Sequence, residues 1–577
     1  MIIFASFETE FSAHGGLGAV MKLLPKEVGK DECAIIAPLF RKFMDPGQLV
    51  ASGAGASEKT LLDYHVLVRG QAHRVEVVEI LSASGVRHFF LSTNDFFTAP
   101  TNPYTNPCDP TRPIDPYRNP NNGEKLIEDA LFFSIAVPVA LAELAKGGWI
   151  RDRDITLHLQ DWETAAIAAA VRKVNLKPAL QSIRCVLTIH NPYDQPLHAM
   201  NSMNVCDLAT SLGFKNGHSI LEQVIPLLDA PLSTVSDAFA SELRNEPLYT
   251  QIFCPHLQPV FKTRGLVGID NGIFGAGNFP FSSDALSRAK KGDYHLIAEE
   301  KAGFRNQLTN LMEKLPEDPA GQTLDLTKPE LPLFFFLGRD DPRQKGFDVM
   351  VEAIRSIDPG KARYLFAIMP GDEGRDGLGF IRELAAERPG EVFLIAGRME
   401  KSTFDQLRLG CSYLVMGSLY EPFGAANEGY IAGMPVIARA TGGLLQQVTP
   451  MLECLINEDI LGLYGRQMIR RYHGPAEKPT GILFREEVSF ADEVDGWKAI
   501  IACGYLNGNP RADRLEERSE ILLFKEMAAS AAAALELAIV TFGDKDKYAA
   551  MIYHGWRLLE KFSWKRAVSS YRQHLYQ

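Results

Sequence analysis

Residues 414–448 read LVMGSLYEPFGAANEGYIAGMPVIARATGGLLQQV, and this stretch decides the fold. Its pattern predicts a buried strand, a loop with Glu421, a helix, a second strand, and a tight turn at Gly442 and Gly443. Strands that alternate with helices are typical of a parallel sheet covered by helices. The stretch therefore predicts an α/β fold.

Residues 334–345, FFFLGRDDPRQK, predict another buried strand that runs into a polar loop with Arg339 and Lys345. In parallel sheets, ligands bind at the carboxyl ends of the strands. Both cations, the Glu421 carboxylate and the glycine turn come directly after predicted strands. We therefore expect two cations, a carboxylate and an anion-accepting turn at one edge of a sheet.

The composition is typical of a globular chain with a full core, because 46% of the 577 residues are hydrophobic and 23% are charged. The formal net charge is −11 and no basic block is present, which argues against binding to nucleic acid or to a membrane surface. Eight scattered cysteines without a C-x-x-C pair predict reduced thiols in a cytoplasmic protein. The N-terminal MIIFASF lacks the features of a signal peptide, and no apolar run has the length of a membrane span.

The two stretches resemble glycosyltransferases of the GT-B fold, and they are most similar to bacterial glycogen synthases and plant starch synthases. That family has segments like R-x-x-x-Q-K-G, E-P-x-G and R-x-T-G-G-L. The matching segments here are RDDPRQKG at 339–346, which is one residue longer, EPFG at 421–424 and RATGGL at 439–444. Further matches follow in the family order, namely HGGLG at 14–18, HLQDW at 158–162, TIHNPY at 188–193, TGILF at 480–484 and FSW at 562–564.

The resemblance implies an α/β GT-B fold in which two Rossmann-like domains face a deep cleft. The implied parts are an acceptor-side domain at residues 1–268, a nucleotide-sugar domain at 269–545, and C-terminal helices at 546–577 that cross back onto the first domain. Residues 97–123 are rich in Pro and Asn and predict an irregular loop, which is either a lid or an insertion. Residues 449–480 resemble an insertion relative to short synthases.

Glu421, His190 and Asp161 are candidate catalytic residues through the resemblance. The matching family Glu lies beside the transferred sugar and supports its oxocarbenium-like centre, and the matching His contacts that sugar. The alternative for Glu421 and Asp161 is a helix-capping role, and the alternative for His190 is a structural role. Nothing resembles a paired-carboxylate metal site such as D-x-D near the predicted cleft, and Arg339 and Lys345 are available there in place of Mg²⁺. We therefore expect no metal ion and no other cofactor.

Sugar transfer from a nucleoside diphosphate develops negative charge on the leaving phosphates, which preorganised cations and N–H dipoles stabilise. Arg339 offers a planar guanidinium for this purpose and Lys345 a point charge. Glycine turns and helix starts offer backbone N–H groups. The expected donor-binding backbone comprises Gly15, Gly16, Gly18, Gly424, Ala425, Ala426, Thr441, Gly442 and Gly443.

Two departures from the family concern the donor site. The family has K-x-G-G-L at its first glycine loop, whereas this chain has Ala13 in place of the Lys, with the largely neutral His14 as a candidate substitute. Synthases also have EPCGLTQLY where this chain has EPFGAANEG, so that Ala426 and Asn427 replace a Thr and a Gln. The sequence therefore leaves the donor open between ADP-glucose, UDP-glucose and another hexose nucleotide.

The resemblance implies a retaining hexosyltransferase that moves glucose from a nucleotide sugar, with ADP-glucose favoured, to the non-reducing end of an α-1,4-glucan. One alternative is a GT-B enzyme that uses another NDP-hexose and a small acceptor. The other is a glucan-binding regulatory homologue with weakened catalysis. Ala13 supports the regulatory alternative, whereas the joint presence of both cations, His190 and Glu421 argues against it. The oligomeric state stays open.

Overall fold

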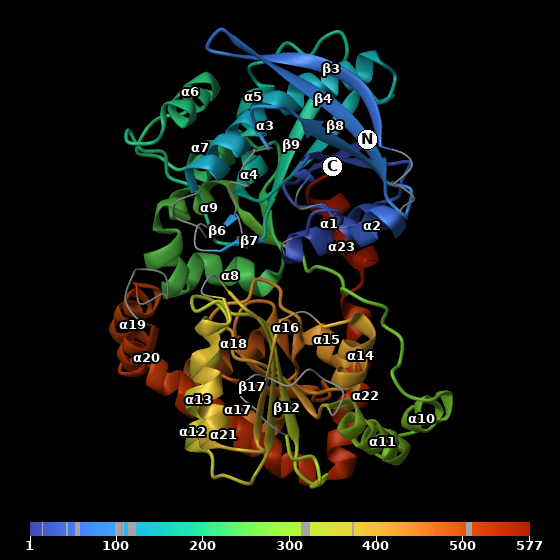
Figure 1. Ribbon diagram of the computed structural model, residues 1–577, viewed down its shortest axis with the longest axis vertical. Helices are drawn as coiled ribbons and strands as arrows, with labels where there is room; N and C mark the ends of the chain where they lie inside the picture. Colours follow the sequence, from blue (N-terminus) through green and yellow to red (C-terminus); the bar gives the residue numbers. More distant parts are fainter. Residues whose placement is uncertain are drawn as a thin grey trace. The chain divides into compact units, whose positions relative to one another are not determined.

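The computed structural model describes residues 1–13, 15–41, 44, 46–51, 58–97, 105–106, 109–113, 123–312, 324–371, 374–397, 399–502 and 511–577, and Figure 1 shows its ribbon. The chain divides into two compact units. Unit 1 contains Met1–Arg244, Phe253–Gly272 and Trp564–Gln577. Unit 2 contains Asn245–Ile252 and Ile273–Ser563.

A nine-stranded sheet forms the centre of unit 1. Its strands, in spatial order, are β11 (Leu266–Gly268), β10 (Leu232–Thr234), β9 (Ser182–Ile189), β8 (Asp154–Gln160), β1 (Ile2–Ala5), β2 (Cys33–Pro38), β5 (Arg87–Ser92), β4 (Gln71–Leu81) and β3 (Lys59–Val68). Neighbouring strands from β11 to β5 are parallel, and β5, β4 and β3 form an antiparallel meander. Strands β6 (Thr105–Asn106) and β7 (Asp109–Pro113) form a second, small antiparallel sheet.

Helices follow most of the parallel strands of unit 1, as the alternating sequence pattern predicts, and one further helix comes from the end of the chain. They are α1 (Gly16–Val28), α2 (Pro46–Ala51), α3 (Gly123–Lys146), α4 (Trp162–Ala165), α5 (Ile167–Val171), α6 (Met203–Leu212), α7 (Ile220–Val224), α8 (Asp237–Asn245), α9 (Gln258–Arg264) and α23 (Trp564–His574). The long helix α3 packs against α4, α5, α6 and β3.

Unit 2 has a six-stranded sheet in which every neighbouring pair is parallel. Its strands, in spatial order, are β14 (Val392–Ala396), β13 (Arg363–Met369), β12 (Leu333–Arg339), β15 (Tyr413–Met416), β16 (Val436–Arg439) and β17 (Gly481–Phe484). This confirms the strands expected within residues 334–345 and 414–448. Phe334, Phe335 and Phe336 of β12 are fully buried, because a parallel sheet has helices on both faces.

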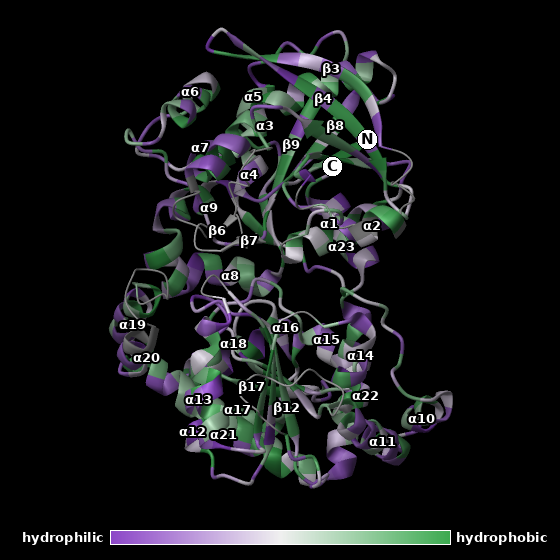
Figure 2. Ribbon diagram, in the orientation of Figure 1, coloured by the Kyte–Doolittle hydropathy of each residue, from purple (hydrophilic) through white to green (hydrophobic). Residues whose placement is uncertain are grey.

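The helices of unit 2 follow the strands in the same alternation. They are α10 (Ser283–Ala289), α11 (His295–Met312), α12 (Phe347–Ser356), α13 (Gly379–Glu387), α14 (Lys401–Gly410), α15 (Ala426–Ile431), α16 (Leu444–Gln447), α17 (Leu452–Ile456), α18 (Leu463–Tyr472), α19 (Phe490–Ala502), α20 (Arg511–Ser519), α21 (Leu522–Gly543) and α22 (Lys545–Leu558). Figure 2 shows that apolar residues concentrate in the strands that these helices cover. Residues 449–480, which resemble an insertion, contain α17 and α18.

The strand order of each sheet reverses at one point. In unit 2 the chain leaves β12 towards β13 on one side and returns with β15 on the other. In unit 1 the corresponding place lies at β1 and β8, because β2 follows β1 on one side and β8 to β11 continue on the other. Open α/β sheets bind ligands at such topological switch points, outside the carboxyl ends of the strands.

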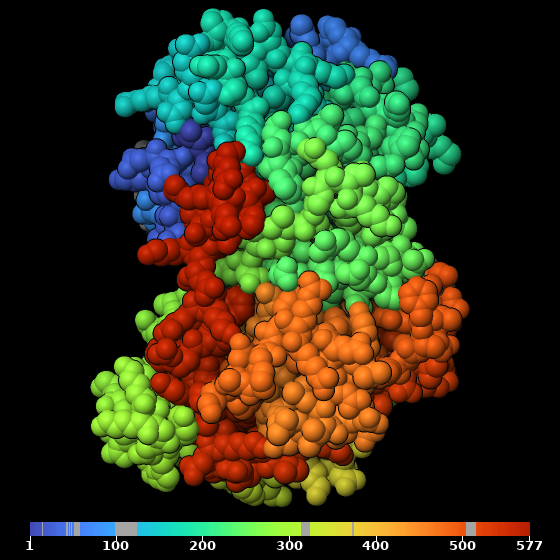
Figure 3. All heavy atoms as spheres, turned by 180° about the vertical axis from the view of Figure 1, so that it is seen from behind, coloured from blue at the N-terminus to red at the C-terminus, as the bar shows by residue number. Residues whose placement is uncertain are grey.

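The C-terminal helices belong to different units. Helix α22 packs against α11, α15 and α21 of unit 2, and Figure 3 shows the red residues near the end of the chain beside orange residues of unit 2. Helix α23 packs against α1 of unit 1. A Cβ atom on Gly272 would lie 2.5 Å from the Trp564 ring, so this close approach requires glycine. Trp564 is thus a packing residue within unit 1.

None of the helices in the described ranges combines the length and the apolar composition that a membrane span requires.

Candidate functional site

An ion pair marks the switch point of unit 2. Lys345 follows β12, Glu421 follows β15, and the Lys345 Nζ atom donates to the Glu421 Oε2 atom at 2.7 Å. The same carboxylate oxygen accepts a hydrogen bond from the Ser418 hydroxyl at 2.9 Å. The side chains of Glu421 and Lys345 are only 9% and 22% exposed. The structure therefore brings together the cation and the carboxylate that the sequence placed at one sheet edge.

The loops that carry Lys345 and Glu421 are held against each other by backbone contacts. The Leu419 amide donates to the Gln344 carbonyl oxygen at 2.7 Å. Gly346 has φ 61°, and a Cβ atom there would lie 2.3 Å from the Gly417 carbonyl oxygen. Glycine is required at 346 both for this left-handed conformation and for the close approach. The pair is thus positioned by the backbone on either side of it.

The glycine turn after β16 packs on the Glu421 loop. Cβ atoms on Gly442 and Gly443 would lie 1.8 Å and 2.0 Å from the carbonyl oxygens of Glu421 and Phe423. The Gly443 amide donates to the Glu421 carbonyl oxygen at 3.0 Å. This corrects the expectation that Gly443 offers its N–H group to a phosphate, because a carbonyl group within the protein accepts that bond. The two glycines serve close packing of the backbone.

The remaining donor-site candidates of unit 2 lie around the same loops. Arg339 ends β12, and Thr441 is buried in the turn after β16. Gly424 has φ 91° and precedes Ala425, the N-cap of the short helix α15, whose first residue is Ala426. Burial, the largest cause, raises the pKa of Glu428 in the first turn of this helix, although Arg408 and Lys345 oppose the shift.

Asn427 deserves comparison with the family because it replaces a Gln. Its side chain is buried, and neither its oxygen nor its nitrogen has a hydrogen-bond partner among the residues that the structure describes. A buried amide without a partner is energetically costly. The structure gives no role to this residue.

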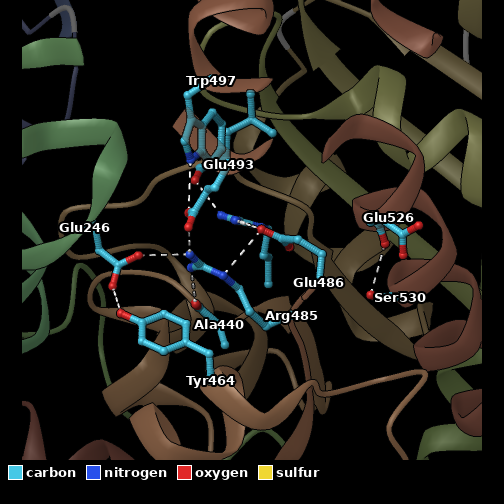
Figure 4. Close-up of polar contacts among 11 residues, drawn as sticks. Glu246, Ala440, Tyr464, Arg485, Glu486, Glu493, Trp497, Glu526 and Ser530 are labelled. Atoms are coloured by element: carbon cyan, nitrogen blue, oxygen red, sulfur yellow. Dashed lines mark hydrogen bonds and ion pairs between the residues drawn. The ribbon is translucent and has the colours of Figure 1, made fainter. Parts of the chain in front are cut away.

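A network of buried charged side chains contacts the loops that follow β15 and β16, and Figure 4 shows part of it. Arg439 forms two hydrogen bonds with Glu486, one of them from Nε at 2.9 Å. It also donates to the Leu419 carbonyl oxygen at 2.6 Å and lies over the Trp497 ring. Arg439 therefore fixes the loop that presents Glu421.

Arg485 extends the network to a segment distant in sequence. It donates to the Ala440 carbonyl oxygen at 2.9 Å and to Glu246 at 3.0 Å, and the Tyr464 hydroxyl also donates to Glu246. All three contacts are visible in Figure 4. Burial alone would raise the pKa of Glu486, but Arg439 and Arg485 overcome it and hold that pKa below its usual value.

Sequence reasoning did not identify Arg485, Glu486 and Glu246. The first two follow directly on the TGILF match at 480–484, so two opposite charges at the end of a buried strand were the available signal. Glu246 lies 239 residues from Arg485 along the chain, and no local pattern indicates that contact.

Asp161 lies at the switch point of unit 1, directly after β8. It has φ 60°, which is unusual for a residue other than glycine. Its side chain does not cap helix α4, so the helix-capping alternative is wrong. Its Oδ1 atom instead accepts bonds from the His190 amide at 2.5 Å and the Asn191 amide at 3.3 Å. Strained residues of this kind cluster at functional sites.

His190 follows β9 and points towards the end of β8. Its Nε2 atom lies 2.7 Å from the Gln160 side-chain oxygen, so Nε2 carries the proton when the ring is neutral. Burial lowers the pKa of His190 to about 3. The ring is therefore neutral near pH 7, with Nδ1 as a hydrogen-bond acceptor.

Three carboxylates lie close to one another at this switch point. Burial, the largest cause, and the neighbouring Glu8 raise the pKa of Asp161 to about 7, against the effect of the two amides. Burial first, and then Asp161 and Glu8, raise the pKa of Glu163 well above its usual value. The Glu163 Oε2 atom has no partner among the described residues. Sequence reasoning did not identify Glu8 or Glu163.

His158, the first residue of the HLQDW match, has a structural role. Its ring nitrogens lie 2.7 Å from the Tyr576 hydroxyl and 2.7 Å from the Thr188 hydroxyl. Burial first, and then His190, lower the pKa of His158 to about 3. This neutral ring thus joins the end of the chain to the centre of the unit 1 sheet.

The first glycine loop opens helix α1, as predicted. Gly15 is the N-cap, Gly16 is the first helical residue, and Gly18 is buried in the first turn. The Gly15 and Gly18 amides donate to the Glu8 Oε2 atom at 2.8 Å and 3.2 Å. This corrects the expectation that these two amides are available to a phosphate. His14, the candidate substitute for the family Lys, lies outside the described residues.

Within the described ranges, no group of three His, Cys, Asp or Glu side chains has an arrangement that would hold a metal ion.

Comparisons with known proteins show to which class of enzyme the chain is similar. Residues 325–453, which span most of the unit 2 sheet, match the family model glycosyl transferases group 1. The catalytic domain of starch synthase IV from Arabidopsis thaliana, bound to ADP and acarbose, superposes with a TM-score of 0.59. The match covers 95% of this chain and 99% of that chain at 17% sequence identity, and it shows the fold. The chain is therefore a glycosyltransferase with the GT-B fold, as the sequence predicts.

Residues 1–254 match the family model of the starch synthase catalytic domain. The glycogen synthase of Lactococcus lactis subsp. lactis (strain IL1403) is 25% identical over 472 residues, which cover 78% of this chain and 86% of that protein. The glycogen synthase of Aromatoleum aromaticum is 26% identical over 470 residues, with 78% and 82% covered. The chain is a glycosyltransferase similar to glycogen and starch synthases.

Proposed function

We propose that the chain transfers glucose from a nucleotide sugar, with ADP-glucose preferred over UDP-glucose, to the non-reducing end of an α-1,4-glucan with retention of configuration. In this reaction the bond between the anomeric carbon and the diphosphate oxygen breaks. A bond from that carbon to the acceptor hydroxyl oxygen forms, and the hydroxyl proton leaves with the nucleoside diphosphate. The glycogen synthases to which the chain is similar support the acceptor, and the starch synthase IV domain bound to ADP supports the nucleotide.

The observation that carries this proposal is the Lys345–Glu421 pair at the switch point of unit 2. The reaction develops negative charge on the leaving diphosphate and positive charge at the anomeric carbon. Lys345, together with Arg339, would stabilise the first charge, and Glu421 would stabilise the second. In the absence of substrate the two side chains neutralise each other, so neither is buried as an isolated charge.

Unit 1 supplies the sugar-side groups in this proposal. The neutral His190 offers an acceptor at Nδ1, and Asp161 is held by two backbone amides. Carboxylates and imidazoles are suited to neutral sugar hydroxyls, which donate and accept hydrogen bonds. We accordingly assign the acceptor side to residues 1–268 and the nucleotide sugar to residues 269–545, with residues 546–577 as the returning segment.

In this proposal the reaction requires no metal ion or other cofactor, because Lys345 and Arg339 would neutralise the diphosphate. The proposal includes a cytoplasmic location, which the six free cysteines among the described residues, all buried or partly buried, favour.

Two observations favour a second candidate function, a glucan-binding homologue with weakened catalysis. Ala13 stands where the family has a Lys, and the Gly15 and Gly18 amides are engaged by Glu8. Both features remove groups that would bind the donor at the first glycine loop.

The first experiment measures nucleotide release from ADP-glucose and from UDP-glucose, each with and without glycogen. The wild type is compared with Glu421→Gln, and Glu428→Gln is the matched control because Glu428 is a partly buried carboxylate in helix α15, which follows the Glu421 loop. We expect glycogen-dependent release from ADP-glucose that falls about 100-fold or more in Glu421→Gln alone. Release that is unchanged in Glu421→Gln would contradict the assignment of Glu421. Glycogen binding without any release would support the regulatory candidate.

A further inference from the structure

The first glycine loop of unit 1 contains its own anion. Glu8 follows β1, is only 4% exposed, and accepts hydrogen bonds from the Gly15 and Gly18 amides through Oε2. These amides belong to the N-cap and first turn of the 13-residue helix α1. A carboxylate at this position takes the hydrogen bonds and the favourable end of the helix dipole that a phosphate would use.

The loop is folded tightly around this contact. A Cβ atom on Gly18 would lie 2.4 Å from the Ala13 Cβ atom and 3.1 Å from the Thr9 carbonyl oxygen. A Cβ atom on Gly15 would meet both carboxylate oxygens of Glu8, at 3.6 Å and 3.9 Å. Glycine is therefore required at 18 for the loop to close, whereas a Cβ atom on Gly15 would make an ordinary contact with the Glu8 carboxylate. An external anion would have to displace this carboxylate from the two amides.

The ionisable groups beside Glu8 are acidic, and each of them opposes an external anion when it carries its charge. Asp161 and Glu163 lie close enough for Glu8 to affect the ionisation of both. Glu10 is a further buried acidic residue near the loop, and its nearest basic neighbour, Lys22, is 4.0 Å away. The family Lys that would offset these charges is replaced by Ala13.

We propose that Glu8 is a specificity-determining residue that keeps the donor diphosphate off the first glycine loop and leaves this loop to a neutral, hydroxyl-bearing part of a substrate. The inference rests on the proposed function for the identity of that substrate, a nucleotide sugar. In this chain the cations of unit 2, Lys345 and Arg339, then carry the binding of the diphosphate.

Calorimetric titration with inorganic pyrophosphate, ADP and UDP tests the proposal. The variants are Glu8→Ala, Glu8→Gln, Ala13→Lys and the double variant Glu8→Ala/Ala13→Lys, each in the wild-type and Lys345→Met backgrounds. Pyrophosphate needs no transferase activity for its binding, so the result is independent of whether the chain transfers sugar. The Lys345→Met background removes the main unit 2 cation and thereby isolates the contribution of the loop.

We expect the double variant to bind pyrophosphate and both nucleotides at least about tenfold more tightly than its parent, because two amides and one ammonium become available. Ala13→Lys alone should gain less, because the new ammonium would pair with Glu8. Glu8→Gln keeps an oxygen that accepts bonds from the amides but loses the charge, so we expect an intermediate gain in affinity. This variant replaces Glu8→Ala in the comparison if Glu8→Ala does not fold. Glu10→Gln is the matched control, since it removes a neighbouring negative charge without freeing the amides.

Unchanged or weaker binding in the double variant, with its fold confirmed by circular dichroism, would overturn the proposal. An equal gain in Glu10→Gln would also overturn it, because general charge repulsion would then explain the effect. If the wild type releases no nucleotide from any donor while the double variant gains affinity for pyrophosphate, the proposed function fails and the role of Glu8 stands.

Discussion

The two switch points have the same topology and opposite electrostatics. At the switch point of unit 2, Lys345 pairs with Glu421, and the Arg439–Glu486 pair supports the loop behind them. At the switch point of unit 1, Asp161, Glu163 and Glu8 lie close together, and backbone amides donate to Asp161 and Glu8. The same fold thus presents compensated charges in one unit and, in the other, a carboxyl cluster in which burial raises the pKa of Asp161 and of Glu163.

This difference separates two kinds of binding. Paired charges can exchange partners with a charged ligand, as Lys345 would do when a diphosphate arrives. Asp161, with a pKa of about 7, gains or loses its proton near neutral pH, and a carboxyl group can bind neutral hydroxyl groups without requiring an ion. The comparison predicts that substitutions in unit 2 act through lost ion pairs and that substitutions in unit 1 act through pH.

The largest expected effect is on the folding of unit 2. Arg439→Met leaves the fully buried Glu486 without its main partner, so we expect the free energy of unfolding to fall by about 3–5 kcal/mol. Urea denaturation measures this loss. Arg355→Met, which breaks an ion pair with the half-exposed Glu387, is the matched control and should cost at most about 1 kcal/mol. Equal losses in the two variants would contradict a buried network.

Asp161→Asn should stabilise the protein in a pH-dependent way. The carboxyl pKa is about 7 in the folded chain and has its ordinary value, 3.8, in the unfolded chain. Between these values only the folded state holds the proton, so the wild type loses stability as the pH rises from 4 to 7. The gain of the Asn variant is therefore near zero below pH 4 and largest above pH 7, at about 2–4 kcal/mol.

Thermal unfolding of wild type and Asp161→Asn from pH 4 to pH 8 measures this difference. Asp152→Asn is the control, because the Asp152 carboxylate is exposed and pairs with the N-terminal amine of Met1. Its effect on stability should show no comparable dependence on pH. A gain that is constant over this pH range would show that Asp161 keeps an ordinary pKa. We expect the same Asn variant to lose transferase activity, because strained functional residues commonly reduce stability.

Lys345→Met should reduce kcat by about 100-fold, or about 3 kcal/mol, because it removes a cation that acts on the leaving diphosphate. It also leaves the Glu421 carboxylate without its 2.7 Å partner. Lys345→Arg keeps the charge and should retain more activity. Steady-state kinetics with saturating donor separates kcat from KM. A change in KM with unchanged kcat would show that Lys345 binds the ground state only.

The strand ends were predictable from sequence, whereas the contacts between loops were not. Buried strands followed by polar loops placed Lys345 and Glu421 at one sheet edge, because β12 and β15 are parallel neighbours. The hydrogen bonds from the Gly15 and Gly18 amides to Glu8 depend on the path of the backbone between residues 8 and 18. Arg439 meets Glu486 across 47 residues, and such long-range charge pairs leave no periodic signal. The resemblance itself pointed to phosphate at both glycine turns, where the protein's own oxygens accept bonds.

The smallest expected effect concerns the uncharged hydrogen bonds of the His158 ring with Tyr576 and Thr188 in unit 1. Tyr576→Phe removes the hydroxyl that lies 2.7 Å from the His158 ring, and it should cost about 1 kcal/mol of unfolding free energy. The partly exposed Tyr576 puts the loss at the lower end of the range for a deleted buried hydrogen bond. Burial holds the pKa of His158 at about 3, so His158 is neutral in the folded protein both at pH 5 and at pH 8.

The cost of Tyr576→Phe should therefore be equal at these two pH values, which urea denaturation at each pH measures. A double-mutant cycle with Thr188→Val, on the other ring nitrogen, reports the coupling through the imidazole. If the cost of Tyr576→Phe grew as the pH fell from 8 to 5, His158 would be charged in the folded protein. Unit 1 would then contain a buried cation to compensate its carboxylates, and the electrostatic contrast with unit 2 would no longer hold.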